Sequence, residues 1–190
     1  RITKILNNTM YISNSVQSMD SDVLKEIKRK NLSPVELEKN KESLKSIRQE
    51  PEIIVPLPNE TKVTFFNGLN KLFDSGPNQR FAVFQTLILT NTEMAHGTSI
   101  EKFGLQIKHK QHHDLIGYVG DNFVCETERV VAGTNTLSTE EYLECRVYAM
   151  LLDTILRFEP TLIPPRISLD ATSSPKLRHV SLNSFAPSLW

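Results

Sequence analysis

The chain has 190 residues, enough for one domain and a short extension, and its 39% hydrophobic and 23% charged residues exclude a largely disordered protein. The 22 basic and 22 acidic residues balance, so charge supports neither a nucleic-acid partner nor a membrane surface. The sequence contains no run of about 18 apolar residues, so no transmembrane helix is predicted.

The first part of the chain alternates strand-like and helix-like segments. Polar and apolar residues alternate over 11–18, which predicts a strand. A helix is expected over 20–30, with Asp20 or Ser21 as its N-cap. A second, very polar helix is expected over 33–48. It begins with SPVE, which places a capping Ser, a first-turn Pro and a Glu at the spacing of a capping box.

Two short apolar runs follow, at 52–57 (EIIVPL) and 81–89 (FAVFQTLIL), and each predicts a parallel strand buried on both faces. Residues 62–74, between them, carry apolar side chains at helical spacing. Strands that alternate with helices favour parallel β/α units, from an open sheet or a barrel. The buried stripe of the helix is expected to comprise Val63, Phe66, Leu69, Leu72 and Phe73.

The pattern changes in the second half. Periodicity is weak over 92–135, which predicts loops with strands at 123–126 and 129–132. A long amphipathic helix is expected over 138–158, because STEE at its start forms a second capping box. Pro, Ser and Thr dominate 161–190, which predicts an extended, peripheral tail. The buried side of the long helix is expected to comprise Leu143, Val147, Leu151, Ile155 and Phe158.

Four segments, taken in order, resemble radical S-adenosylmethionine (SAM) enzymes. Residues 16–29 (VQSMDSDVLKEIKR) resemble the family's GVQS segment, and 54–61 (IVPLPNET) resemble its I-x-GLPGET segment. The run 81–89, followed by Thr-Glu-Met, is similar to the next strand of the family. Residues 128–142 resemble the C-terminal segment of the cobalamin-binding group of these enzymes.

The resemblance implies an α/β fold with three parts. Residues 1–90 are expected to form the C-terminal half of a (β/α)6-type partial TIM barrel, 91–160 a C-terminal α+β extension with one long helix, and 161–190 an extended tail. The family uses a [4Fe–4S] cluster to cleave SAM reductively and to start radical chemistry, such as methylation, cyclisation or rearrangement of a small-molecule substrate. The resemblance at 128–142 points to cobalamin as a further cofactor.

Five residues are expected to contact SAM. By resemblance, Gln17 and Arg29 hold the carboxylate of its methionine part, and an arginine is suited to a carboxylate through two parallel hydrogen bonds. The alternatives are a strand-end polar residue for Gln17 and a cation at a helix C-terminus for Arg29. Glu60 is expected to bind a ribose hydroxyl or to favour the start of the next helix, and Val55 and Leu57 to line the adenine or to be core.

Two departures from the family pattern concern the cofactors. Pro56 and Asn59 replace the two glycines of GLPGE, which let a backbone approach a ligand closely, so adenine contacts are expected to differ here. The CxxxCxxC motif, which the family carries upstream of the matched segments, does not occur, and Cys125 and Cys145 offer no metal-binding spacing. The chain alone is therefore expected to be inactive, and two isolated cysteines favour a reducing, cytoplasmic compartment.

Two other hypotheses stay open. The chain could be a degenerate, non-catalytic half-barrel that acts as a binding module, or an unrelated open-sheet enzyme. A half-barrel leaves apolar faces and a strand edge unpaired, so the chain is expected to be poorly stable or oligomeric and to pair with an N-terminal half of the same enzyme or a partner subunit. The first residue, Arg1, predicts processing or truncation, and 109–114 (HKQHHD) are predicted to be a solvated loop rather than a metal site.

Overall fold

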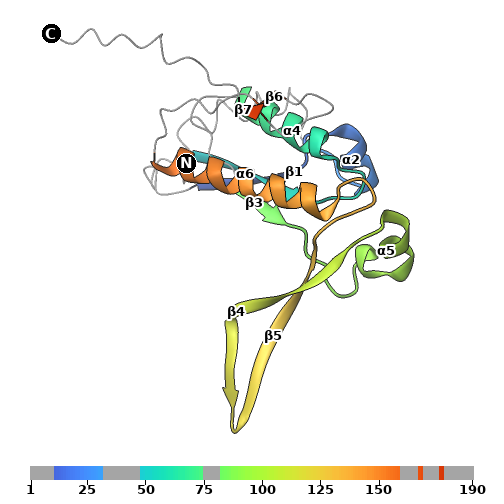
Figure 1. Ribbon diagram of the computed structural model, residues 1–190, viewed down its shortest axis with the longest axis vertical. Coiled ribbons are helices and arrows are strands. Elements are labelled where there is room, and N and C mark those ends of the chain that lie inside the picture. Colours follow the sequence, from blue (N-terminus) through green and yellow to red (C-terminus); the bar gives the residue numbers. More distant parts are fainter. Residues whose placement is uncertain (1–10, 32–47, 75–81, 159–166, 169–175, 178–190) are drawn as a thin grey trace, which may run out of the picture.

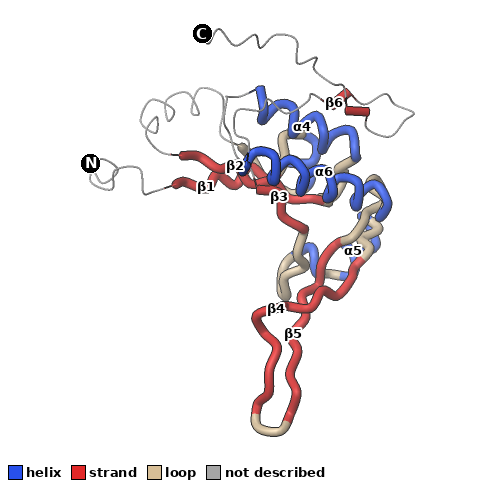
Figure 2. The backbone as a smooth tube through the Cα atoms, turned by 60° about the vertical axis from the view of Figure 1, so that its left-hand side comes forward, coloured by secondary structure: helices blue, strands red, loops and turns tan. Residues whose placement is uncertain are grey.

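The computed structural model describes residues 11–31, 48–74, 82–158, 167–168 and 176–177. In this part of the chain a small parallel sheet is covered on one face by two long helices, and a β-hairpin projects from the opposite side (Figure 1). Figure 2 shows the helices, the sheet and the hairpin in that order along the molecule.

The sheet consists of β1 (Tyr11–Gln17), β2 (Arg48–Val55) and β3 (Ala82–Gln85), paired in parallel in that order. The three predicted strands are confirmed with changed ends: β2 begins earlier, where the polar helix was expected to end, and β3 is half as long as predicted. Ile53 and Val55 are buried against the helices, and Ile54 between them lies on the opposite face of the sheet.

Helix α4 (Lys62–Asp74) has the predicted bounds, and α2 (Ser21–Glu26) is shorter than predicted. Asp20 caps α2, because its carboxylate accepts hydrogen bonds from the N–H groups of Asp22 and Val23 at 3.0 Å. The predicted stripe of α4 is wrong at Val63, which is 47% exposed; the buried face instead begins at Phe65. The remaining apolar residues of this face with described side chains, Phe66, Leu69 and Leu72, are buried as predicted.

Helix α6 (Thr139–Phe158) also has nearly the predicted bounds, and its capping box is present. The Ser138 N–H donates to the Glu141 carboxylate at 3.0 Å, and the Glu141 N–H donates to the Ser138 hydroxyl at 3.2 Å. The buried side was predicted wrongly at three positions, and the side chains of Ile155 and Phe158 lie outside the described residues. Leu143, Val147 and Leu151 are 50–54% exposed, while the core side comprises Tyr142, Cys145, Tyr148, Ala149 and Leu152.

The rotation of α6 is fixed by contacts that the periodicity of apolar residues does not reveal. The Arg146 guanidinium donates to the carbonyl of Val83 in β3 at 2.6 Å. The Tyr148 ring packs edge-on against Phe66 of α4, with ring centroids 5.1 Å apart. One hydrophobic core therefore joins the strands, α4 and α6, and so includes residues from both sides of position 90.

Residues 92–135 are much more regular than the predicted loops. A 3-10 turn (Glu93–Ala95) and helix α5 (Gly97–Phe103) lead into β4 (Ile107–Val119), which pairs in antiparallel fashion with β5 (Asn122–Val131). We call the β4–β5 hairpin the arm. Its strands include both short strands predicted in this region, and the histidine-rich segment is part of β4 rather than a loop.

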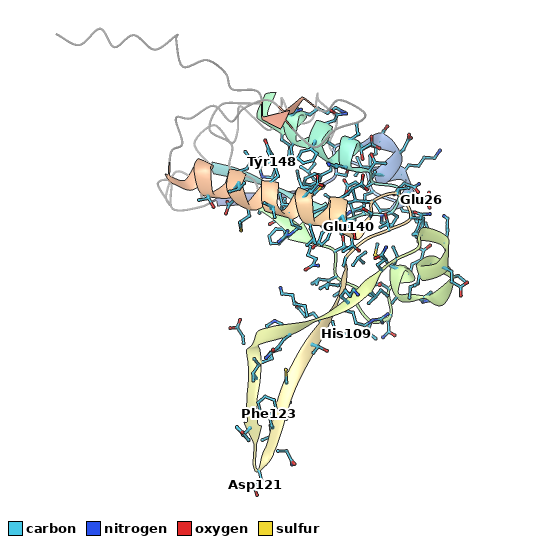
Figure 3. All side chains as sticks on the ribbon, in the orientation of Figure 1. Glu26, His109, Asp121, Phe123, Glu140 and Tyr148 are labelled. Carbon is cyan, nitrogen blue, oxygen red and sulfur yellow. The ribbon has the colours of Figure 1, made fainter. Side chains whose placement is uncertain are left out.

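In the contacts described, the arm joins the rest of the protein, the body, only at the end near Arg129 and Val131, which we call its root. The Ile88 N–H donates to the Arg129 carbonyl at 2.8 Å, and the Val131 N–H donates to the Thr86 carbonyl at 2.9 Å. A second, smaller core of Ile88, Leu105 and Val131 lies at this junction. Figure 3 places Asp121 at the tip of the arm and Phe123 in its outer half, far from both cores.

The α/β class is confirmed, whereas the three parallel strands of the described residues do not confirm a partial barrel. The polar helix expected over 33–48 falls, except for Arg48, outside the described residues, as does most of the predicted tail. Within that tail, β6 (Ile167–Ser168) and β7 (Lys176–Leu177) form a short antiparallel pair. None of the described helices is both long and apolar enough to cross a membrane.

Candidate functional site

A cavity of about 540 Å³ opens on the face of the sheet opposite α4 and α6. It lies where the parallel strands end, since Gln17 and Gln85 are the last residues of β1 and β3 and both line it. The carboxyl ends of parallel strands are the usual place for a ligand in α/β proteins. Its volume is in the range of small-molecule pockets, and its apolar lining includes Ile54, Leu57 and Phe84.

Gln17 and Arg29, the two residues expected to hold the methionine carboxylate, meet at this cavity. The Arg29 Nε donates a hydrogen bond to the Gln17 Oε1 at 3.1 Å, and both side chains line the cavity. The pair is solvent-accessible, so the hydrogen bond itself contributes little to stability. The hydrogen bond instead orients the Arg29 guanidinium, whose planar set of N–H donors suits a carboxylate.

Two left-handed residues bring this pair together. Gln17 has a φ of 64°, at a bulge where the β1–β2 register shifts, and Lys28 has a φ of 56° just after α2. The Lys28 turn ends the helix in a Schellman motif, in which the Arg29 N–H donates to the Leu24 carbonyl at 2.8 Å. A left-handed conformation costs about 1 kcal/mol for a residue other than glycine, so the surrounding structure holds both residues against a local preference.

Two further pairs of polar residues line the cavity. On the strands, the Ser15 hydroxyl donates to the Glu52 carboxylate at 2.8 Å, and these two residues are register partners in β1 and β2. On the arm, Lys110 and Glu128 are register partners, with Nζ and Oε2 4.0 Å apart. The charges of Arg29, Glu52, Lys110 and Glu128 cancel, which suits a ligand with both signs of charge.

The other three predicted cofactor residues lie in different places. Val55 is fully buried in the core beneath the helices and does not line the cavity. Leu57 lines the cavity. Glu60 is buried behind this wall, and its Oε2 accepts a hydrogen bond from the Leu57 N–H at 3.2 Å. It thereby holds the β2–α4 loop in shape; the SAM-binding role of all five residues stays a prediction.

Glu60 has an unusual environment for a carboxyl group. Burial, the largest cause, raises the pKa of Glu60 to about 8; the Asp20 charge acts in the same direction, and the hydrogen bonds from Leu57 and Ser18 act in the opposite one. The carbonyl of Glu60 also accepts a hydrogen bond from the Thr136 hydroxyl at 2.7 Å. The loop that carries Leu57 is thus fastened to the segment that precedes α6.

Pro56 and Asn59, which stand in place of the two family glycines, lie in this loop. Asn59 has a φ of 63°, a left-handed conformation that asparagine tolerates better than most residues, and its side-chain amide donates to Glu26 at 3.3 Å. Pro56 is buried, and its carbonyl accepts a hydrogen bond from the Thr86 hydroxyl at 2.6 Å. Asn59 therefore fills a backbone position for which glycine is the ordinary choice.

The two cysteines do not fit a [4Fe–4S] cluster. Cys125 is exposed on the arm, whereas Cys145 is buried in α6, where burial raises the pKa of its thiol to about 12. A cluster needs several thiolates on one site, and Cys145 stays a neutral thiol. In the described part of the chain no group of three or more His, Cys, Asp and Glu side chains could hold a metal ion.

Sequence reasoning missed Glu52, Phe84, Lys110 and Glu128 as cavity residues. The two strand residues could have been found, because they alternate with core residues in β2 and β3 and so face the other side of the sheet. The two arm residues gave no comparable signal, since the arm itself was not predicted.

Comparison with known proteins gives two significant relatives. The cobalamin-dependent radical SAM methyltransferase TokK of Streptomyces tokunonensis is 29% identical over 133 residues, and 2-(S-pantetheinyl)-carbapenam-3-carboxylate methyltransferase of Streptantibioticus cattleyicolor is 30% identical over 134 residues. This chain is similar to a segment of radical SAM methyltransferases. The resemblance seen in the sequence is thereby confirmed.

The similarity covers much of this chain but only a small part of each relative. The matches cover 68% and 69% of this chain but only 19% of each relative, so the chain spans about a fifth of the proteins that it resembles. A scan against models of protein families finds no match. The activity of a whole methyltransferase is accordingly a matter of proposal for this chain.

Proposed function

We propose that this chain forms one wall of the SAM-binding cavity of a radical SAM methyltransferase. The observation that carries the proposal is the Gln17–Arg29 pair, hydrogen-bonded at 3.1 Å on the wall of a cavity at the carboxyl ends of parallel strands. The resemblance assigns these two residues to the methionine carboxylate of SAM. The similarity to two methyltransferases supports the same assignment.

The residues of the cavity have separate tasks in this proposal. Arg29 binds the carboxylate through its guanidinium, and Gln17 keeps the guanidinium turned toward it. Leu57, Ile54 and Phe84 provide apolar surface for the adenine. SAM bound in this cavity would supply the 5′-deoxyadenosyl radical, and this chain would bind and orient it. The cluster ligands are supplied by residues other than the two cysteines of this chain.

A titration of the 190-residue chain with S-adenosylhomocysteine, followed by calorimetry or saturation-transfer NMR, tests the proposal. Arg29→Gln removes the charged donor, so we expect the affinity to fall by about tenfold or more. Arg29→Lys keeps the charge but not the fork and should give an intermediate loss. The matched control is Lys30→Gln, an equal charge change on an exposed neighbour that does not line the cavity. Equal losses in both variants, or no binding by the wild-type chain, would overturn the proposal.

A second candidate function is a binding module without catalysis. It is favoured by large apolar side chains on two surfaces, the outer side of α6 and the outer half of the arm, where Tyr118 and Phe123 are 74% and 61% exposed. Under this hypothesis the chain binds a partner protein and not SAM. The same titration separates the two, because a wild-type chain that self-associates without binding S-adenosylhomocysteine would favour the module.

A further inference from the structure

Lys110 lines the cavity although it belongs to the arm. β4 begins 22 residues after β3 ends at Gln85, yet Lys110 shares one cavity with Gln17, at the end of β1, and Arg29, just after α2. The arm is brought there by its root, where the hydrogen bonds from Ile88 to Arg129 and from Val131 to Thr86 fix its exit from the body. The backbone hydrogen bonds at the root thus place the positively charged Lys110 side chain at the cavity.

The contact between Lys110 and Glu128 is loose. Their Nζ and Oε2 atoms are 4.0 Å apart, which is beyond hydrogen-bond range, although the two residues face each other as register partners. Glu128 also lies 3.8 Å from the Nε2 of His112. A partly exposed ion pair at this distance contributes little on its own, so a ligand carboxylate can compete for the ammonium at small cost.

We propose that Lys110, at the root of the arm, is a specificity residue of this cavity that binds a carboxylate on the methyl acceptor. This deepens the proposed function, on which it rests, by naming a substrate class. Arg29 serves the carboxylate of SAM in that proposal, so Lys110 supplies a second cation for the second ligand. The neighbouring Glu128 favours a singly charged carboxylate over a doubly charged phosphate, because it repels additional negative charge.

The apolar lining between the charged groups suggests the probe. Ile54, Leu57 and Phe84 suit a flat, apolar body, so a matched set of naphthalene compounds tests the charge alone. We would titrate the chain with 1-naphthaleneacetate, with its neutral amide and with 1-naphthyl phosphate, and follow binding by saturation-transfer NMR. The wild-type chain should bind the acetate about fivefold more tightly than the amide, and more tightly than the phosphate.

Three variants assign this preference to a residue. Lys110→Met should bring the acetate-to-amide ratio to about one, whereas Lys108→Met, an exposed lysine on the same strand outside the cavity, should leave the ratio unchanged. Glu128→Gln should raise the ratio, since it removes the competing carboxylate. Circular dichroism of each variant confirms that the arm is folded. A wild-type ratio of one, or a Lys110→Met variant that keeps the preference, would overturn the inference.

The two titrations distinguish a failure of the proposed function from a failure of the Lys110 inference. S-adenosylhomocysteine reports on the Gln17–Arg29 end of the cavity, and the naphthalene set reports on the Lys110 end. Binding of S-adenosylhomocysteine without an acetate preference would retain the proposed function and remove the carboxylate site. An acetate preference that depends on Lys110, without S-adenosylhomocysteine binding, would establish the anion site and overturn the proposed function.

Discussion

Glu60 shows how a single buried residue shapes the cavity from behind its wall. Its carboxyl group lies behind the cavity wall and accepts the N–H of Leu57, which does line the cavity. Burial, the main cause, raises its pKa to about 8. Between its ordinary pKa and that value the folded chain keeps a proton that the unfolded chain has lost. The contribution of Glu60 to stability therefore falls as the pH rises through this window and levels off above it.

Glu60→Gln should remove this pH dependence, because the amide is neutral at every pH and its oxygen can still accept the Leu57 N–H. We expect the unfolding free energy of the wild-type chain to fall by at most about 4 kcal/mol relative to the variant between pH 5 and pH 8. Urea denaturation at several pH values measures it. The control is Glu140→Gln on the exposed first turn of α6, which should follow the wild type. Equal slopes for Glu60→Gln and wild type would contradict the assignment.

At the residue scale, family resemblance located Gln17 and Arg29, because the residues that carry it are close together in the chain. It could not show that Arg29 reaches Gln17 through a left-handed turn at Lys28, since a lysine gives no signal for that conformation. Lys110 and Glu128 escaped prediction for a different reason. They join the cavity through contacts between segments far apart in the chain, and no local pattern encodes such contacts.

Helix α6 shows where local pattern suffices and where it fails at the scale of an element. The capping box at Ser138 fixed its start from the sequence alone, because the chemistry of a cap involves only neighbouring residues. Its buried side could not be fixed in the same way. Apolar residues occupy two sides of the helix, and the choice between them depends on partners such as Phe66 and the Val83 carbonyl.

Two adjacent leucines test this assignment of faces. Leu152 is 2% exposed in the core and Leu151 is 50% exposed on the outer side. Leu152→Ala should lower the unfolding free energy by about 2–5 kcal/mol, because it leaves a cavity, whereas Leu151→Ala should change it by less than about 0.5 kcal/mol. Urea denaturation of both variants decides between the faces. If Leu151→Ala were the more costly change, the predicted side would be the buried one after all.

The arm is an element that sequence reasoning reduced to loops. Its weak signal has a physical cause: over most of its length both faces are exposed, so the alternation of polar and apolar residues that marks a half-buried strand is not required. Two-stranded hairpins of this kind are marginally stable in water. The Tyr118 and Phe123 rings, whose centroids are 5.5 Å apart, supply one cross-strand contact near the tip.

At the scale of the whole molecule, large apolar side chains are exposed at the outer side of α6 and along the arm. Parallel sheets are ordinarily covered on both faces, and the described residues pair β1 on one edge alone. That an N-terminal half of the same enzyme or a partner subunit completes the sheet stays a proposal, which accounts for these exposed surfaces and the open edge of β1. The partial barrel stays a proposal, since it depends on strands beyond the three described.

The isolated chain should therefore self-associate. Light scattering across a concentration series should show an apparent mass above 21.6 kDa that rises with concentration. The double variant Val147→Glu with Leu151→Glu places charge on the outer side of α6 and should shift association to higher concentrations by about tenfold or more. The control replaces the exposed Glu140 by Gln. A monomer at every concentration would contradict the expectation that these surfaces need cover.

The way in which the arm joins the sheet has a consequence for the order of folding. The cavity draws its walls from β1, β2, β3 and the arm root, which are separated by long stretches of chain. The entropy of closing such loops delays contacts of this kind, while the arm can zip locally from its turn. We therefore expect the cavity to be among the last features to form during refolding. In pulsed hydrogen exchange during refolding, amides that bond between β4 and β5 should gain protection before those of Ile88 and Val131, which bond between the arm and the rest of the protein.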